Sequence, residues 1–287
     1  MDVKDFDSGE LSEMLAFVSD LASSAGQIIA DAIRAKKLVT NKSQRDFVTD
    51  TDEKCEVIIL DALKEKYPTH KFIGEEETAK AGVLPDLTDE PTWFCDPLDG
   101  TTNFVHGFPF VCVSIGLTLK KQPVLGVVHS PILEETFTAA KGLGALRNGS
   151  RISTSGETQM MRSLVITELG PDRSPSTLDT WMGRYRSVAE RCRSMRGIGS
   201  CAIGMASVAC GRADAMYEVG FGGPWDCVAG AALVTEAGGC VFDPSGKPFS
   251  VMCRRVACSA SPALEWALAE ALAPNSSNPS EPEYFAL

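Results

Sequence analysis

The sequence predicts an α/β protein of the α+β type, in which helices flank runs of antiparallel strands. Apolar residues recur at helical spacing over residues 9–36, and strand-like segments joined by short turns follow one another over 110–149. Helical patterns return over 225–237 and 262–273. Because the strands come in runs instead of alternating singly with helices, a layered architecture is favoured over a doubly wound parallel sheet.

The first part of the chain is expected to form two helices. Apolar residues from Leu11 to Ile33 lie at three- and four-residue steps, so residues 9–36 predict a long amphipathic helix. A second helix is expected to begin after Thr49-Asp50-Thr51-Asp52 and to end before Pro68. The polar residues between the two helices predict a loop that contains Lys42.

The middle of the chain predicts an antiparallel meander. Residues 110–119 and 124–129 read as two strands joined by a turn at 120–123. Residues 134–140 and the Asn148-Gly149 turn continue the pattern.

The last part predicts an Ala-rich helix over 225–237, a short strand over 240–242 and a final helix over 262–273. Residues 275–287 are polar and contain Pro and Ser, so a disordered tail is expected. No internal repeat or linker divides the chain before that tail.

Composition excludes some classes of partner. The 287 residues carry 27 basic and 38 acidic side chains, and the net charge of −11 argues against a surface for nucleic acid or anionic membrane. The acidic N-terminus lacks the layout of a signal peptide, and no apolar run is long enough to span a bilayer. The ten cysteines form no C-x-x-C pair, which is typical of reduced thiols. We therefore expect a cytoplasmic protein.

The stretch Trp93–Phe104, WFCDPLDGTTNF, indicates a metal and phosphate site. Asp96 and Asp99 are short carboxylates held close by the intervening Pro97, and hard cations such as Mg²⁺ prefer carboxylate oxygens. Gly100, Thr101 and Thr102 supply backbone N–H groups and hydroxyl groups that suit a phosphate. The alternative interpretation is a simple turn, since D-P-x-D-G is also favourable turn chemistry.

Other acids strengthen the interpretation as a site. Glu75, Glu76 and Glu77 follow the apolar Phe72-Ile73, and Asp226 stands at the start of the expected helix 225–237. Each of these groups taken alone is typical of surface charge or of an acid at a helix N-terminus. Their occurrence together with the Asp96–Asp99 pair favours an acidic site.

Competing signatures are weaker. Residues 197–202 fit GxGxxA, but charged residues precede them where a dinucleotide-binding fold needs a buried strand. Residues 50–54 resemble the DxDxT of aspartyl-phosphate phosphatases but end in Lys54. His70, His106 and His129 are far apart and form no metal-binding pattern.

The motifs in their order resemble the inositol monophosphatases, a family of Mg²⁺-dependent, lithium-sensitive phosphatases. The resemblance extends from about residue 10 to 272. It implies a layered αβαβα sandwich of the inositol monophosphatase and fructose-1,6-bisphosphatase type, with residues 1–274 as a single catalytic domain, usually in a homodimer. The motifs are DFVTDTD (46–52), FIGEE (72–76), DPLDGTTNFVHGFPF (96–110), GSCA (199–202), YEVGFGGPWD (217–226) and EAGG (236–239).

The resemblance also implies roles for individual residues. One Mg²⁺ is expected on Glu75, Asp96 and the Leu98 carbonyl, a second on Asp96, Asp99 and Asp226, and a weaker third near Glu75. Thr101, oriented by Asp52, and Glu75 are implied to activate the attacking water. The remaining implied contacts are with the substrate: Asp99, Gly100, Thr101 and Thr102 with the phosphate, and Gly199, Ser200, Cys201, Glu218 and Asp226 with the sugar side.

The implied reaction is hydrolysis of a small polyol or sugar phosphate by direct attack of a metal-activated water. The run 88–118 and the form FGGPWD are most similar to plant-type members that also hydrolyse L-galactose 1-phosphate besides myo-inositol 1-phosphate. Alternatives are a relative acting on histidinol phosphate, fructose 1,6-bisphosphate or a 3′-phosphonucleotide, and a catalytically silent phosphate-binding dimer.

Two positions depart from the family pattern. Lys42 stands four residues before Asp46, where some relatives place a lysine five before, so the resemblance assigns Lys42 no role. Cys201 stands where animal relatives have a smaller alanine, which predicts a tighter sugar side.

Overall fold

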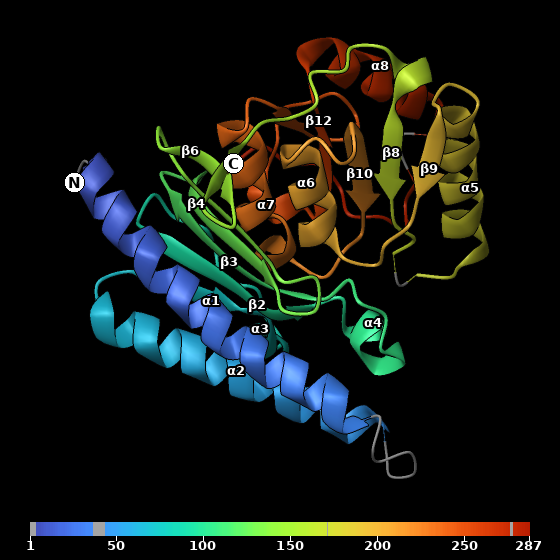
Figure 1. Cartoon of the computed structure of the whole chain (residues 1–287). Helices are drawn as coiled ribbons and strands as arrows, with labels where there is room; N and C mark the ends of the chain where they lie inside the picture. Colours follow the sequence, from blue (N-terminus) through green and yellow to red (C-terminus); the bar gives the residue numbers. More distant parts are fainter. Residues whose placement is uncertain (1–3, 37–43, 171, 276–277) are drawn as a thin grey trace.

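The computed structural model describes residues 4–36, 44–170, 172–275 and 278–287. These residues form two mixed sheets and eight α-helices stacked in five layers (Figure 1). Helices α1 and α2 cover one sheet, α6 and α7 lie between the sheets, and α5 and α8 cover the other. The layered αβαβα sandwich expected from the sequence is confirmed.

The first sheet contains seven strands in the order β1-β2-β3-β4-β5-β6-β7. β1 and β2 are parallel, and all later neighbours are antiparallel, so the meander predicted over 110–149 is confirmed. The strands are β1 (Lys71–Gly74), β2 (Thr92–Asp99), β3 (Cys112–Leu119), β4 (Gln122–Ser130), β5 (Glu135–Ala140), β6 (Gly144–Arg147) and β7 (Ser150–Ile152).

Two long helices, α1 (Ser8–Lys36) and α2 (Gln44–Lys66), bury the outer face of this sheet. α1 begins with a capping box, because the Asp7 carboxylate accepts the Glu10 N–H at 2.9 Å and the Glu10 carboxylate accepts the Asp7 N–H at 2.8 Å. The apolar stripe of α1 then packs on β3, β4 and β5, as its spacing predicts.

The second sheet contains five strands in the order β11-β12-β10-β8-β9. β8, β9 and β10 are parallel to one another, and β11 and β12 are antiparallel additions. The carboxyl ends of the parallel strands meet at one edge. The strands are β8 (Leu164–Thr167), β9 (Ser194–Arg196), β10 (Ala215–Val219), β11 (Cys240–Phe242) and β12 (Arg255–Ser259).

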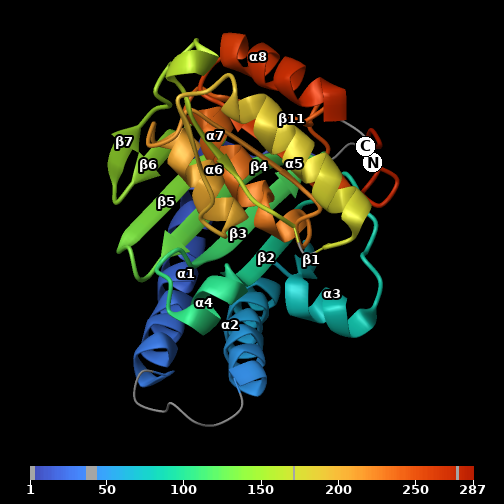
Figure 2. The same cartoon turned by 90° about the vertical axis from the view of Figure 1, so that its right-hand side faces the viewer.

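The remaining helices place the second sheet in the molecule. α6 (Cys201–Ala209) and α7 (Val228–Glu236) form the middle layer, and all but the last two residues of α7 are buried. α5 (Pro175–Ala189) and α8 (Pro262–Leu272) lie on the far side of the second sheet, away from α1 and α2 (Figure 2). Two short helices, α3 (Glu75–Ala81) and α4 (Thr101–His106), follow β1 and β2 directly.

The structure corrects two boundaries. α2 begins at Gln44, before the expected start after Asp52, because residues 44–66 contain no Gly or Pro to stop a helix. Asp52 therefore lies inside the helix, and Lys42 lies outside the described residues. The helix expected over 225–237 is divided into a 3₁₀ turn, Pro224–Asp226, and α7.

The described end of the chain, residues 278–287, differs from the disorder that its composition favours. The Arg184 guanidinium on α5 forms two hydrogen bonds with the Glu281 carboxylate, at 2.5 and 2.6 Å, and both side chains are buried. The Phe285 N–H contacts the Cys253 sulfur at 3.2 Å. Because the two residues of this buried ion pair lie 97 positions apart, the pair leaves no local signal in the sequence.

Candidate active site

The two aspartates of the quoted stretch lie at the end of β2, next to an irregularity in the sheet. The pairing of β2 with β3 shifts register between Asp96 and Asp99. Such a bulge bends a strand and redirects its side chains. The exposed fractions of Asp96 and Asp99 are 3% and 7%, so both carboxylates are buried. The Asp96 Oδ1 accepts the Leu98 N–H at 2.9 Å, which fixes the turn around Pro97.

Asp99 joins the first sheet to the middle layer. Its Oδ2 accepts hydrogen bonds from the Ser200 hydroxyl at 2.6 Å and from the Ala202 N–H at 2.8 Å, at the start of α6. Ser200 is also the N-cap of this helix, since its Oγ accepts the Ile203 N–H at 3.2 Å. The predicted GSCA segment is therefore brought against the predicted metal and phosphate segment.

The chain after Asp99 turns sharply into α4. Gly100 has a φ of 90°, and a Cβ there would lie 2.7 Å from the Phe110 carbonyl oxygen, so only glycine fits. Thr101 and Thr102 are exposed, as groups that meet a substrate must be. The Thr101 hydroxyl donates to the Leu98 carbonyl oxygen at 3.2 Å.

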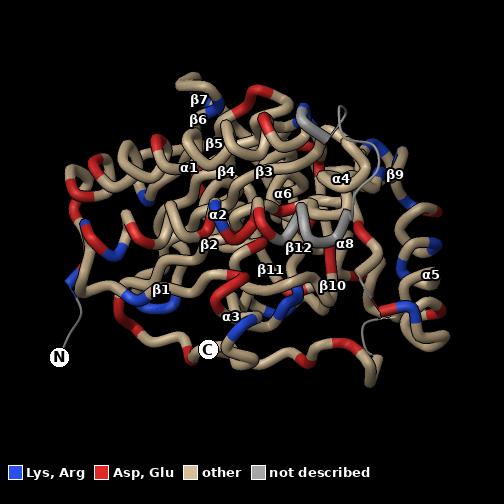
Figure 3. Tube along the Cα trace, turned by 90° about the horizontal axis from the view of Figure 1, so that it is seen from below, with Lys and Arg blue, Asp and Glu red and all other residues tan. Residues whose placement is uncertain are grey.

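Acids from α2 and α3 form a second part of the site. Figure 3 shows acidic segments along α2 and at the start of α3. Glu56 on α2 is buried, and its carboxylate accepts the N–H groups of Glu76 and Glu77 at 2.8 and 2.7 Å. Glu56 thus caps α3 and holds Glu75 at the end of β1. Asp52 lies one turn before Glu56, and burial together with Glu76 and Glu75 raises the pKa of Asp52 to about 8.

Asp226 enters the site from the 3₁₀ turn before α7. Its Oδ2 accepts the Gly222 N–H at 3.0 Å, and the Ser114 hydroxyl holds the neighbouring Trp225 carbonyl at 2.9 Å. Asp226 is buried, and this burial, with the charges of Asp99 and Glu75, raises its pKa well above the usual range.

Four of the predicted site residues, Glu75, Asp96, Asp99 and Asp226, influence one another electrostatically. Burial and the nearby Glu75, Asp226 and Asp99 charges raise the pKa of Asp96, and burial raises the pKa of Glu75 to about 7. Acids gathered in one place that is largely shielded from solvent favour a cation, because a cation removes their mutual repulsion.

The donors suit a hard cation chemically, since they are carboxylates and the Leu98 carbonyl. In the described residues, however, no three Asp, Glu, His or Cys side chains are already drawn together closely enough to hold an ion. The structure therefore places the expected ligands near one another without forming a finished coordination shell.

Glu218 lies in the second sheet, at the carboxyl end of β10. Side chains alternate along a strand. Met216 faces α6, so Glu218 faces α6 as well, whereas Tyr217 faces α5 and α8. Burial, with the charges of Glu168 and Asp99, raises the Glu218 pKa to about 8. Its Oε2 is buried and has no hydrogen-bond partner within the described part of the chain.

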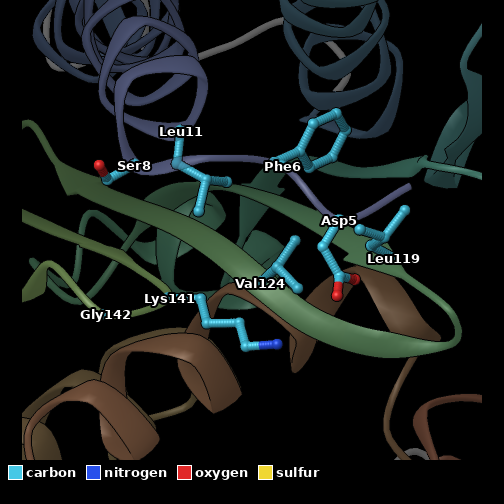
Figure 4. A pocket seen from close by; sticks show the side chains of 8 residues that line it. All are labelled: Asp5, Phe6, Ser8, Leu11, Leu119, Val124, Lys141 and Gly142. Carbon is cyan, nitrogen blue, oxygen red and sulfur yellow. The ribbon is translucent and has the colours of Figure 1, made fainter.

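Two cavities lie away from this group of acids. Figure 4 shows one of about 280 Å³ at the start of α1, between Phe6, Leu11, Leu119 and Val124. Another, of about 480 Å³, lies beyond the ends of β8 and β10, on the α5 side, and the tail residues Ser280–Pro282 form one wall. Neither is lined by any of the residues that the sequence predicts for the site.

Three residues of the site were not identified from the sequence. Glu56 caps α3, Asn103 binds three backbone carbonyl groups, and Glu168 accepts a backbone N–H. Asn103 lies within the DPLDGTTNF motif, which could have drawn attention to it. Glu56 and Glu168 have no motif of their own, so only the fold reveals their contacts.

Comparisons with known proteins show the family of this sequence. The sequence matches the inositol monophosphatase family over residues 10–279. It is 52% identical to inositol monophosphatase 2 of Solanum lycopersicum over 249 residues, which is 87% of this chain and 94% of the relative. It is 44% identical to inositol monophosphatase 1 of Homo sapiens over 246 residues, 85% of this chain and 88% of the relative.

A solved structure supports the same relationship. The inositol monophosphatase from Anabaena (Nostoc) sp. PCC 7120 superimposes with a TM-score of 0.80 at 32% identity. The match covers 91% of this chain and 96% of the other. Within the described residues, no helix has the length and apolar character needed to cross a membrane.

Proposed function

Because this chain belongs to the inositol monophosphatase family, we propose that it hydrolyses the monophosphate ester of a small polyol or sugar. The candidate substrates are myo-inositol 1-phosphate and L-galactose 1-phosphate. The observation that carries the proposal is the group formed by the buried Asp96, Asp99 and Asp226 with the half-buried Glu75, next to the exposed residues Thr101 and Thr102.

Enzymes of this family generally use Mg²⁺. In this chain, two to three ions would be held by Glu75, Asp96, the Leu98 carbonyl, Asp99 and Asp226. Bound Mg²⁺ would neutralise phosphate oxygens and lower the pKa of a water molecule. The buried position of Asp96 between the other acids suits a ligand shared by two ions.

The chain's own groups would position the attacking water. Thr101 carries a hydroxyl on the exposed start of α4, and its present acceptor is the Leu98 carbonyl. Asp52 lies on the neighbouring helix α2, with a carboxyl whose pKa is raised to about 8. We expect Thr101, held in orientation by Asp52, and Glu75 to activate the attacking water.

Other groups would hold the two ends of the substrate. The backbone and hydroxyl groups of Gly100–Thr102 would bind the phosphate. Glu218, whose Oε2 has no partner among the residues that the structure describes, would accept a hydrogen bond from a hydroxyl of the polyol, alongside Gly199, Ser200 and Cys201. A buried carboxylate oxygen that has no partner among the described residues is costly unless a ligand supplies one, which supports this assignment.

Further features belong to the same proposal. We expect a homodimer that is inhibited by Li⁺ and located in the cytoplasm. Each of these can be tested on the purified or expressed protein: by sedimentation, by inhibition at constant ionic strength with K⁺ as the control, and by imaging.

A phosphate-release assay tests the proposed reaction. The purified protein is incubated with inositol 1-phosphate, L-galactose 1-phosphate, histidinol phosphate, fructose 1,6-bisphosphate and a 3′-phosphonucleotide, in Mg²⁺ or in EDTA. We expect release from the first two in Mg²⁺, with none in EDTA. Full activity in EDTA would remove the metal from the proposal.

The same assay decides among the alternatives. Preference for histidinol phosphate, fructose 1,6-bisphosphate or the nucleotide would assign the chain to a related phosphatase. No release from any substrate, together with tight phosphate binding, would indicate a catalytically silent protein.

A further inference from the structure

Residues Ile198 and Gly199 connect β9 to the start of α6, and they lie between the two halves of the candidate site. On one side is the segment Asp99–Thr102. On the other are the carboxyl ends of β8 and β10, with Glu168 and Glu218. Any shift of Ile198 and Gly199 would move Ser200, which donates to Asp99 at 2.6 Å.

Glu168 holds this segment from the second sheet. It follows the last residue of β8 and lies next to Glu218, because β8 and β10 are parallel with Thr167 opposite Tyr217. Ile166 and Met216 both face α6, so the alternation of side chains directs Glu168 and Glu218 to that same face. The Glu168 carboxylate accepts the Ile198 N–H. Burial raises the pKa of Glu168, and backbone hydrogen bonds from Ile198 and Gly199 limit that rise.

Asn103, on the short helix α4 that follows β2, holds the same segment from the other side. Its Nδ2 donates to the carbonyl oxygens of Ile198 at 2.7 Å and Gly199 at 3.2 Å. It also donates to the Phe110 carbonyl oxygen at 2.8 Å, and this hydrogen bond links α4 to the segment that follows it. Ile198 thus has its N–H bound by one side chain and its C=O bound by another.

The close approach explains the glycine at position 199. Gly199 has a φ of 72°, and a Cβ there would lie 2.8 Å from the Asn103 Oδ1. A side chain would both strain the backbone and push Asn103 away. The segment is therefore built to accept two clamping groups.

We propose that Glu168 and Asn103 are positioning residues that clamp Ile198 and Gly199 from opposite sides and so hold the phosphate half of the site in register with the polyol half. The clamp keeps Ser200 and the start of α6 on Asp99 while Glu218 faces the substrate. Its effect on catalysis rests on the proposed function, but the clamp itself can be measured without substrate or metal.

Hydrogen–deuterium exchange of the metal-free protein is the direct test. Glu168→Gln keeps the size of the side chain but removes the charge and one of the two acceptor oxygens, and Asn103→Ala removes the other clamp. In either variant, we expect amides of residues 197–203 to exchange about tenfold faster or more, because charge-assisted hydrogen bonds are the stronger ones. Unchanged exchange in both variants would overturn the clamp.

A matched control uses another carboxylate that binds backbone N–H groups. Glu236 accepts the N–H groups of Gly142 at 3.0 Å and Gly144 at 2.9 Å, in the β5–β6 hairpin. Glu236→Gln should speed exchange in residues 142–144 and leave 197–203 unchanged. If it loosened 197–203 as much as Glu168→Gln does, the effect would be a general loss of stability, and the clamp would be refuted.

Kinetics of the Mg²⁺-loaded enzyme test the consequence. Each single variant should lower kcat/KM for inositol 1-phosphate about ten- to a hundredfold, whereas Glu236→Gln should not. Because both residues hold Ile198, the double variant should lose much less than the product of the two single losses. Independent, multiplying losses would contradict a shared clamp. If the wild type is inactive on every substrate, the proposed function fails, yet the exchange experiment still decides on the clamp.

Discussion

The buried carboxylates of the site differ in their neighbours, and the neighbours indicate different tasks. Asp99 accepts two hydrogen bonds from the start of α6, so one of its oxygens is already fixed. Glu56 has both oxygens occupied by backbone N–H groups of α3, which makes it a structural cap. Glu218 has one buried oxygen without a partner among the described residues, which leaves it available to a ligand.

Thr101→Ala tests the proposed positioning of water at the scale of one hydroxyl. We expect kcat to fall by about a hundredfold or more with little change in KM, as for an interaction formed mainly in the transition state. Thr101→Ser, which keeps the hydroxyl, should retain most of the activity. Steady-state kinetics on inositol 1-phosphate provide the measurement. A rise in KM alone would make Thr101 only a phosphate ligand.

Glu218→Ala tests which end of the substrate this carboxylate contacts. A hydrogen bond from a substrate hydroxyl to a carboxylate contributes about 1.5–3 kcal/mol. We therefore expect kcat/KM for inositol 1-phosphate or L-galactose 1-phosphate to fall by about ten- to a hundredfold. Hydrolysis of p-nitrophenyl phosphate, which has no ring hydroxyl groups, should be largely unaffected. Equal losses on both substrates would show that Glu218 supports the metal ligands or the fold.

At the scale of elements, a helix that packs on the core along one face leaves the clearest pattern in the sequence. α1 shows a clear stripe because it packs on the sheet along one side only. α6 is buried on all sides and so has no period to detect. α3 and α4 are short and contain at most one buried residue, so they too leave little pattern.

Ser200→Ala tests whether a helix cap also serves the site. Ser200 and Ser261 are N-caps of α6 and α8, and each also donates a hydrogen bond, to Asp99 and to the Glu157 carbonyl. Removing either cap should lower the free energy of unfolding by about 1 kcal/mol. Only Ser200→Ala should lower kcat/KM, by about tenfold or more, because Asp99 loses one of its two hydrogen bonds from the start of α6. Chemical denaturation and kinetics on both variants measure this. Equal activity losses would show that the effect comes from stability alone.

At the scale of the whole molecule, the sequence predicts which acids come together better than it predicts the contacts that position them. Asp96, Asp99 and Asp226 stand in recognisable motifs and do converge. The contacts of Glu168 and Asn103 with Ile198 depend on how the two sheets meet through the middle layer, which no local pattern encodes. The anchoring of Glu281 by Arg184 has the same origin.

The concentration of buried acids predicts how the stability of the metal-free protein depends on pH. Burial and neighbouring charges raise the pKa of Asp52 and Glu218 to about 8, and burial raises that of Glu75 to about 7. In the unfolded chain such groups titrate near pH 4. Between these values the folded protein binds more protons than the unfolded chain, so the free energy of unfolding falls as pH rises. Burial lowers the pKa of His70 and His129. These two histidines therefore make the free energy of unfolding rise with pH, but only below about pH 6.5, the pKa of an unperturbed histidine.

We therefore expect the Tm in EDTA to fall by several degrees between about pH 6.5 and 8, where the carboxyl groups lose their protons. Mg²⁺ should raise the Tm more at pH 8 than at pH 6.5, since it binds the deprotonated acids and protons compete with it. Glu218→Gln should reduce the slope in EDTA because it removes one of the titrating groups. Thermal unfolding at constant ionic strength, with Na⁺ in place of Mg²⁺ as the control, measures each effect. Two outcomes would contradict this prediction: a Tm that rises with pH in EDTA, or a Tm that Mg²⁺ does not change at pH 8. Either would show that these acids do not form a cluster of mutually repelling charges that a cation stabilises.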